Sequence, residues 1–157
     1  MPTATHVLIL FSGRCEAGTG CFGFSIRGLN GPLEPIAGCG VLAPPEKGPM
    51  SSEYAAYTAL GRALALCVAS YRASFTPETQ LTICTDCRGV VDQFGGKEVP
   101  AEHLAPLMDA VKEKVSLLGC KRSLQWIPQS QNVEADMLAK AAYVGRTGKP
   151  IPTPQVK

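Results

Sequence analysis

Three isolated carboxylates are the residues of this chain best placed to do chemistry together. Glu53 begins a predicted helix in SSEYAAYTALGRALAL, Asp86 ends a predicted strand in LTICTDCRGVV, and Asp136 opens the last predicted helix in NVEADMLAKAA. A fourth position, Ser12, ends the first apolar strand, HVLILFSG. Acids gathered at one point repel one another unless a cation neutralises them. Taken singly, each acid also fits an ordinary helix-capping or surface role.

Oxygen-only ligands of this kind favour a hard divalent cation. Carboxylates bind Mg²⁺ or Mn²⁺, and two such ions about 3.5–4 Å apart can activate a water and stabilise a leaving oxygen in phosphodiester hydrolysis. The three acids, taken together with the order of the elements that carry them, therefore predict a metal site at Glu53, Asp86 and Asp136.

The elements that must hold these residues follow from apolar spacing and turn residues. Three apolar stretches come first, and their short glycine-containing connections are typical of an antiparallel meander. A helix then begins after Ser51 or Ser52 and buries a stripe with 3–4 spacing. The expected order begins with strands at 6–12, 21–28 and 36–42, the helix just described, a strand at 81–85 and a short helix at 89–94. It continues with a helix whose apolar stripe runs from Leu104 to Leu118, a strand at 123–127 and a last helix capped by Asn132. That last helix carries Leu138, Ala141 and Ala142 and is expected to end before Gly145.

This order predicts an α/β fold with a mixed sheet. The first, fourth and fifth strands are joined through helices, so we expect them to be parallel, with right-handed crossovers. Chemistry in such a sheet collects at the carboxyl ends of parallel strands. Ser12 and Asp86 both stand at such ends, so neighbouring first and fourth strands would place them side by side.

Composition narrows the class of protein. The 157 residues suit one domain, which is predicted at 1–146 with a flexible tail at 147–157. The formal net charge of +2 is far from that of a strongly basic nucleic-acid binder. No apolar run is long enough to span a membrane, and no signal peptide is expected. Seven scattered cysteines indicate an intracellular, reducing compartment, with cytoplasm, nucleus and organelle all open. We interpret the Cys84–Cys87 CxxC as structural rather than redox-active or zinc-binding.

The spacing of these motifs resembles the type 1 ribonuclease H family, in its retroelement, archaeal and plant-like variety, over roughly residues 7–144. The matching motifs are Ser12-Gly13 at the family's Asp-Gly, Ser52-Glu53-Tyr54-Ala55-Ala56 in the first helix, Asp86-Cys87 after the fourth strand, Trp126-Ile127 in the fifth, and Asn132-Val133-Glu134-Ala135-Asp136-Met137-Leu138-Ala139 at the last helix. The resemblance implies a ribonuclease H-like fold, a five-stranded mixed sheet in the order 3-2-1-4-5 with helices on both faces. It also implies Mg²⁺- or Mn²⁺-dependent cleavage of the RNA strand of RNA–DNA hybrids by Glu53, Asp86 and Asp136.

Ser12 is the departure that touches this chemistry. It stands at the vacated fourth acid position, and a neutral hydroxyl cannot bridge two cations as a carboxylate does. We therefore expect any metal to be single and weakly bound, mainly by Asp86. Glu16 is a conceivable substitute, but a loop positions a ligand less well than a strand end. The segments GPMSS, Pro128–Gln131 and Gly95-Gly96-Lys97 lack other supports that family members use, respectively a phosphate pocket, a histidine and a basic protrusion.

Two functions remain open from the sequence. The first is a catalytically impaired module that binds RNA–DNA hybrid or structured RNA, or that scaffolds a larger protein or ribonucleoprotein assembly. The second is an active hybrid endoribonuclease, possible if Ser12 is an engineered change or is compensated. Arg14, Arg88 and Lys97 are the expected nucleic-acid contacts, although solvated surface charge also explains such residues.

Overall fold

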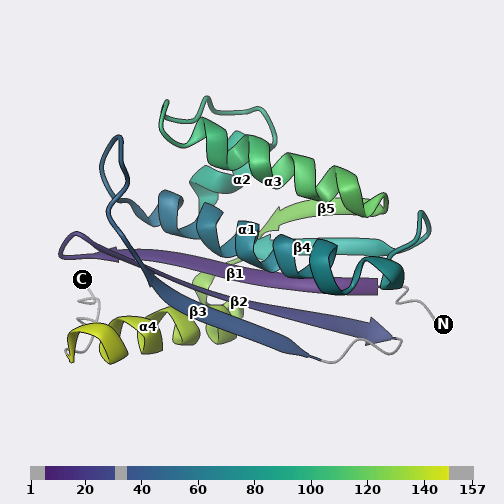
Figure 1. The fold of residues 1–157 in the computed structure, drawn as a ribbon, viewed down its shortest axis with the longest axis horizontal. Coiled ribbons are helices and arrows are strands. Elements are labelled where there is room, and N and C mark those ends of the chain that lie inside the picture. Colours follow the sequence, from purple (N-terminus) through teal and green to yellow (C-terminus); the bar gives the residue numbers. More distant parts are fainter. Residues whose placement is uncertain (1–5, 31–34, 149–157) are drawn as a thin grey trace.

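The computed structural model describes residues 6–30 and 35–148. Its elements follow one another as strands and helices joined mostly by short loops (Figure 1). They are β1 (His6–Glu16), β2 (Thr19–Asn30), β3 (Ile36–Leu42), α1 (Ser52–Ser70), η1 (Arg72–Ser74), β4 (Gln80–Thr85), α2 (Arg88–Phe94), α3 (Ala105–Leu118), β5 (Lys121–Trp126), η2 (Gln129–Gln131) and α4 (Val133–Thr147).

The five strands form one mixed sheet in the order β3-β2-β1-β4-β5, as predicted. β1 pairs with β2, and β2 with β3, in antiparallel register. β4 is parallel to β1, and β5 is parallel to β4. The parallel pairs arise because helices connect those strands, whereas the two hairpins at the start of the chain can only be antiparallel.

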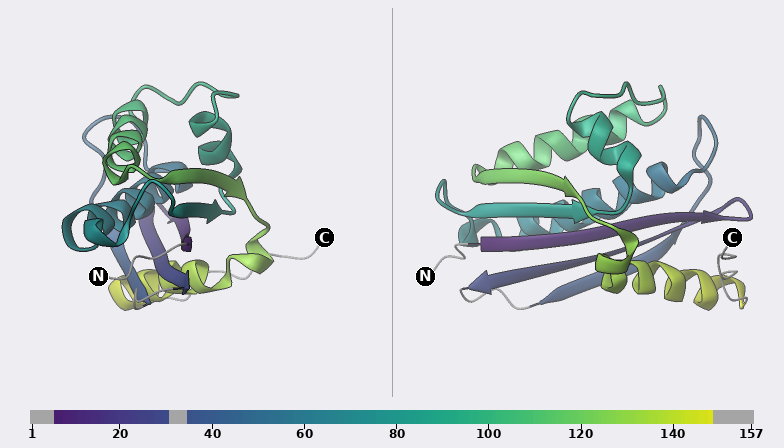
Figure 2. Two further views of the ribbon diagram at one scale, coloured as in Figure 1. Left: turned by 90° about the vertical axis from the view of Figure 1, so that its right-hand side faces the viewer. Right: turned by 180° about the vertical axis from the view of Figure 1, so that it is seen from behind.

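Helices cover both faces of the sheet (Figures 1 and 2). α1 packs on one face against β1 and β2, and α3 packs on α1, so the larger core lies between these helices and the sheet. α4 crosses the opposite face over β1, β2 and β3. It covers a much smaller apolar cluster, formed by Cys21, Ala139 and Tyr143. The two helices that carry Glu53 and Asp136 therefore approach the sheet from opposite sides.

β1 is longer than predicted and passes through Ser12 instead of ending there. The strand continues to Glu16, still paired with β2, and a two-residue turn of Ala17 and Gly18 closes the hairpin with both residues at positive φ. β1 nevertheless separates from β4 after Phe11, because the last pair between them is Phe11 with Thr85. Ser12 thus marks the end of the parallel pairing rather than the end of the strand.

α4 also differs from its prediction. The helix runs past Gly145 to Thr147, and Gly148 ends it with a left-handed φ of 70°. Ala141 is exposed and Leu138 and Ala142 are only half-buried, whereas Ala135, Ala139 and Tyr143 face the sheet. The predicted tail beyond Gly148 lies outside the described residues. Across 6–30 and 35–148, no helix has the length and apolar character needed to traverse a bilayer.

Candidate functional site

Ser12 and Asp86 come together where β1 and β4 diverge. Phe11 is the last residue of β1 in register with β4, opposite Thr85. Ser12 follows Phe11 in β1, and Asp86 directly follows the end of β4, so this register places the two residues side by side. Ser12 is almost completely buried, with 2% of its surface exposed. A small, buried and neutral hydroxyl therefore stands next to the end of β4, where Asp86 follows.

Two glycines allow α1 and α4 to reach the sheet at this point. A Cβ at Gly13 would overlap the backbone of Ala56, and a Cβ at Gly23 would overlap the backbone of Ala135. Gly13 follows Ser12 in the chain, and Gly23 on β2 is the antiparallel partner of Ser12. The N-terminal turns of both helices can therefore lie against the backbone around Ser12, which brings Glu53 and Asp136 to the site.

Glu53 is held in the first turn of α1 by a side-chain network. Ser51 caps the helix, accepting from the Tyr54 N–H at 3.1 Å. The Gln93 amide donates from Nε2 to Glu53 Oε2 at 2.9 Å, and the Tyr57 hydroxyl donates to Gln93 Oε1 at 2.8 Å. Gln93 is buried, and its Nε2 also donates to Glu98 Oε1 at 3.1 Å, so its side chain links Glu53, Tyr57 and Glu98. The Glu53 carboxylate thus has a protein donor of its own.

Asp86 has its donor in Asn132. The Asn132 amide donates from Nδ2 to Asp86 Oδ1 at 2.7 Å and to the Phe11 carbonyl at 2.8 Å. Asn132 was predicted to cap α4; it stands at that position but makes no side-chain capping bond. It is completely buried, and its Oδ1 has no hydrogen-bond donor among the described residues. Its side chain joins β1 to the end of β4 instead.

Asp136 is the most heavily bonded of the three acids. Arg14 Nη1 lies 2.8 Å from Asp136 Oδ1, while Lys140 Nζ and Gln129 Nε2 lie 3.1 and 3.3 Å from Oδ2. Burial alone would raise the pKa of Asp136. The hydrogen bonds from Lys140 and Gln129, together with the charges of Arg14 and Lys140, outweigh burial and lower the pKa below its ordinary value.

Arg14 is directed into the protein. Its side chain is 16% exposed, and Nη2 lies 3.4 Å from Glu16 Oε1 in addition to the bond with Asp136. Its Nε is buried without a hydrogen-bond acceptor among the described residues. Glu16, the conceivable substitute ligand, therefore faces a guanidinium. Arg14 was predicted as a nucleic-acid contact, but its charge is already shared by two carboxylates.

This set of residues does not fit a metal pair. In the part of the chain that the structure describes, no group of three His, Cys, Asp or Glu side chains is arranged to hold a metal ion. Each of the three acids instead accepts from protein N–H groups, and Asp136 accepts from two cationic side chains. Ser12 offers no negative charge. The electrostatic need for a cation at Asp136 is met within the chain.

The other predicted contacts lie at the surface. Arg88 is exposed and its guanidinium stacks 4.1 Å above the Trp126 ring, whose Nε1 donates to the Asp86 carbonyl at 3.2 Å. Lys97 is exposed in the loop after α2. Arg88 therefore stands at the rim of the site, next to Asp86, whereas Lys97 has no described side-chain contact that would tie it there.

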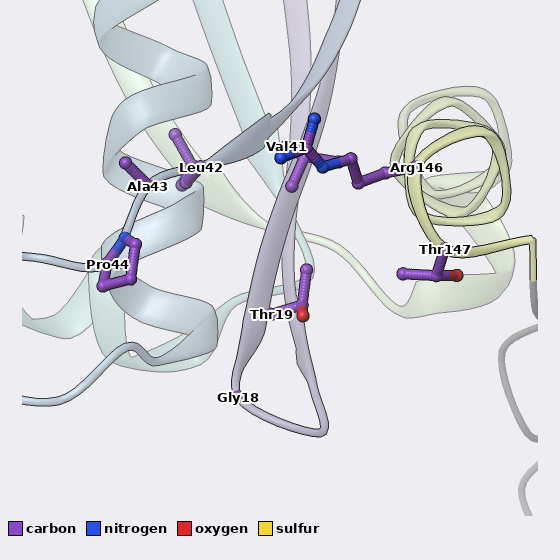
Figure 3. Close-up of a pocket in the computed structure, with 8 residues that line it drawn as sticks. All are labelled: Gly18, Thr19, Val41, Leu42, Ala43, Pro44, Arg146 and Thr147. Atoms are coloured by element: carbon purple, nitrogen blue, oxygen red, sulfur yellow. The ribbon is translucent and has the colours of Figure 1, made fainter.

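A pocket of about 540 Å³ lies away from these acids (Figure 3). It is formed by the β1–β2 turn, the end of β3 and the last turn of α4, where Arg146 extends towards Val41. None of the four predicted site positions lines it. The acids and the pocket are therefore separate features of the fold.

Sequence reasoning missed the residues that bond to the acids. Gln93, Gln129 and Lys140 are polar residues in or before helices, and such residues are usually solvated. Lys140 alone carried a local signal, because it follows Asp136 by four residues and such pairs meet on a helix surface. The acids that Gln93 and Asn132 contact, Glu53 and Asp86, lie 40 and 46 residues away in the chain, so these contacts had no local signature.

Comparisons with known proteins agree with this architecture. Residues 11–142 match the family described as reverse transcriptase-like. The crystal structure of ribonuclease H1 from the halophilic archaeon Halobacterium salinarum NRC-1 has a TM-score of 0.72 at 19% identity, covering 89% of this chain and 98% of that one. The N-terminal ribonuclease H domain of rv2228c from Mycobacterium tuberculosis has a TM-score of 0.71 at 20% identity, covering 92% and 99%.

A third solved structure is LC11-RNase H1 in complex with an RNA/DNA hybrid, with a TM-score of 0.66 at 19% identity and coverage of 89% and 98%. No curated protein matches the sequence. The solved structures agree in fold with the strand order and helix placement seen here, and the family match spans most of the chain. The chain is therefore a ribonuclease H-like domain and belongs to the reverse transcriptase-like family.

Proposed function

We propose that this domain is a catalytically impaired ribonuclease H-like module that binds nucleic acid and serves a binding or scaffolding role. The observation that carries the proposal is the state of the acid site. Ser12 is buried where the resemblance expects a carboxylate, and the neighbouring Asp136 is bound by Arg14 and Lys140. Loss of a shared acidic ligand should cost several kcal/mol of transition-state stabilisation, and each 1.4 kcal/mol is about tenfold in rate.

The proposed ligand is an RNA–DNA hybrid or a structured RNA. LC11-RNase H1, a neighbour in fold, was solved with an RNA/DNA hybrid, and so was the foamy viral protease-reverse transcriptase, which has a TM-score of 0.57 at 14% identity. The Arg88–Trp126 stack supports this ligand, because an exposed cation on an aromatic ring beside the site can contact a phosphate or a base. A larger protein or ribonucleoprotein assembly is the proposed setting.

We place the module in a reducing compartment. All seven cysteines are free thiols, and they lie in or next to strands and helices rather than in paired positions. A low net charge of +2 supports binding aided by a partner rather than by a broad basic surface.

An active endoribonuclease is the second candidate, and one observation favours it. Three of the four expected acids are present, and Asn132 ties Asp86 to the backbone next to Ser12, so the frame of the site is assembled. Under this alternative the chain itself cleaves hybrid.

Hybrid cleavage and hybrid binding, measured side by side, test the proposal. The chain as it stands, Ser12→Ala and Ser12→Asp should be assayed with Mg²⁺ and with Mn²⁺. We expect the chain and Ser12→Ala to bind hybrid with equal affinity and to show no cleavage above a no-protein control. Cleavage by the chain at a rate typical of ribonucleases H would refute the impairment, and absence of any hybrid or RNA binding would refute the nucleic-acid role.

A further inference from the structure

We propose that Arg14 is a built-in counter-cation: its guanidinium supplies at Asp136 the positive charge that a bound metal ion would otherwise supply, and it makes the site structurally independent of divalent cations. The inference deepens the proposed function and rests on it, because it explains how a site without catalytic metal chemistry keeps its buried acid. It concerns one side chain, and its consequences are measurable without an activity assay.

The position of Arg14 on β1 is the first support. Side chains two apart on a strand point to the same face, about 7 Å apart along the chain. Ser12 pairs with Gly23, which lies beneath the backbone of α4, and Arg14 pairs with Cys21, which packs against Ala139 of α4. Ser12 and Arg14 therefore share the face that α4 covers. A long cationic side chain at position 14 can reach back towards the vacated position 12.

The local charge balance is the second support. Two cations, Arg14 and Lys140, and two carboxylates, Asp136 and Glu16, meet at this point. Asp136 is nearly buried, with 7% of its side chain exposed, so its charge needs compensation within the protein. The positive and negative charges cancel without any ion from solution. A divalent cation at Asp136 would have to lie beside a fixed guanidinium of like sign, which opposes its binding.

The unsatisfied Nε of Arg14 is the third support, and it gives a distinctive expectation. This buried N–H has no acceptor among residues 6–30 and 35–148. A carboxylate introduced at position 12 on the same face would be an acceptor within reach. Ser12→Asp is therefore expected to pair with Arg14 and to leave divalent-cation binding unchanged. Removal of Arg14 from Ser12→Asp should then expose a carboxylate pair, at positions 12 and 136, that a cation can bind.

Thermal unfolding with and without divalent cation tests the inference. The proteins are the chain as it stands, Ser12→Asp, Arg14→Met and the Ser12→Asp/Arg14→Met double variant, each in EDTA and in about 10 mM MgCl₂. Arg27→Met is the matched control, since Arg27 also joins a strand to α4 through an ion pair with Glu134, but at an exposed position. Binding of Mn²⁺ to the same proteins, followed by electron paramagnetic resonance, gives a second readout.

We expect Mg²⁺ to leave the Tm of the chain, Ser12→Asp and Arg27→Met unchanged within about 1 °C. Ligand binding raises Tm only when the folded state binds the ion. The double variant should gain about 2–4 °C in Mg²⁺ and bind Mn²⁺ at least about tenfold more tightly than Ser12→Asp. Arg14→Met should have a lower Tm in EDTA than the chain and recover part of the loss with Mg²⁺.

Two results would overturn the inference. One is Mg²⁺-dependent stabilisation of the chain as it stands, which needs no variant to fold. The other is a folded double variant that binds Mn²⁺ no better than Ser12→Asp. If Arg14→Met variants do not fold, Arg14→Lys keeps the charge and must remain insensitive to Mg²⁺. Failure here is distinct from failure of the proposed function, which is decided by hybrid cleavage and binding.

Discussion

Arg14 Nη1 and Asp136 Oδ1 lie 2.8 Å apart and join β1 to α4 across 122 residues of chain. Both side chains are mostly covered, so the contact is a charge-assisted hydrogen bond of low solvent exposure rather than a surface ion pair. Removing one partner of such a pair leaves the other charge buried and unbalanced, which costs far more than losing an exposed pair. The stability of α4 on the sheet should therefore depend on this contact.

Asp136→Asn is expected to lower the free energy of unfolding at pH 7 by about 3 kcal/mol, because Arg14 would keep its charge and lose its main partner. Arg27→Met, which removes the exposed pair with Glu134, should cost less than about 1 kcal/mol. Urea unfolding of both variants measures the difference. Equal losses in the two variants would show that burial of the Arg14–Asp136 pair does not matter.

The acid dependence of stability should carry the signature of Asp136. The pKa of Asp136 is lower in the folded chain than its ordinary value, so the stability it contributes is present above about pH 4 and is lost as pH falls through the lowered pKa. Asp136→Asn removes this titration. Unfolding free energies measured from about pH 6 down to pH 2.5 should therefore fall less steeply for Asp136→Asn than for the unaltered chain. Identical slopes would contradict the assignment.

The sheet order could be predicted because connections dictate it. Short turns around Gly18 force antiparallel pairing, and helices between strands force parallel pairing. The acids could be placed because helix starts and strand ends are locally marked. What the sequence could not show is which side chains complete the site. Asn132 has the local signature of a cap, yet its amide is used by Asp86, 46 residues away.

Arg14 illustrates the same limit. An arginine two residues after a predicted strand end resembles a solvated charge or a phosphate contact, and nothing local indicates an inward direction. β1 in fact continues to Glu16, which keeps Arg14 in a strand and fixes the face to which it points. The partner that holds it belongs to the last helix. Strand length and distant contacts decide where this side chain points, and neither can be derived from neighbouring residues.

Gly13→Ala should be strongly destabilising. A Cβ at this position would overlap the backbone of Ala56 and Ser52, which cannot move without displacing the first turn of α1. We expect a loss of at least about 2–3 kcal/mol, of the size seen when a packed core is overfilled. Gly61→Ala is the matched control, because Gly61 lies within α1 and its Cβ would meet nothing within 4 Å. That control should gain about 0.5–1 kcal/mol from helix propensity.

Chemical denaturation of the two glycine variants decides this prediction. The two changes add the same methyl group, so a difference in sign isolates the close approach of α1 to β1. A Gly13→Ala protein with unchanged stability would mean that α1 can move away from the strand, and it would also weaken the placement of Glu53 next to the site.

Asn132 should act as a tie, that is, as a hydrogen-bonded link between Phe11 of β1 and Asp86 after β4, rather than as a helix cap. Asn132→Ala removes the donors to Phe11 and Asp86 and should cost about 2–3 kcal/mol, since the buried Phe11 carbonyl and the half-buried Asp86 carboxylate both lose a donor. Asn132→Asp should cost more, because it places a carboxylate where two acceptors already converge. Asn132→Ser is the discriminating control: a capping role would be restored by serine, whereas the tie would not. Unfolding free energies that rank serine close to asparagine would contradict the tie.

Thiol reactivity should separate the cysteines by burial. Cys39 is exposed on the edge strand β3, whereas burial raises the pKa of Cys21 to about 11 and of Cys67 to about 12. For Cys21, the nearby Arg14 charge works against burial but does not overcome it. Because the thiolate is the reactive form, Cys39 should react first with a thiol reagent at pH 8, and Cys21 and Cys67 should stay protected until the chain unfolds.

Cys39→Ser should remove the fast phase of that reaction and leave the slow phases unchanged.

A raised pKa also means that the buried thiols favour the folded state while they are protonated, so this contribution is present below about pH 8.5 and is lost as pH rises through about 11–12. For each protein, the free energy of unfolding can be expressed relative to its own value at pH 7. Measured by circular dichroism at alkaline pH, it should begin to fall at a higher pH in Cys67→Ala than in the unaltered chain. Fast labelling of Cys67 in the folded protein would show that the layer between α1 and the sheet opens readily, and both expectations would then be wrong.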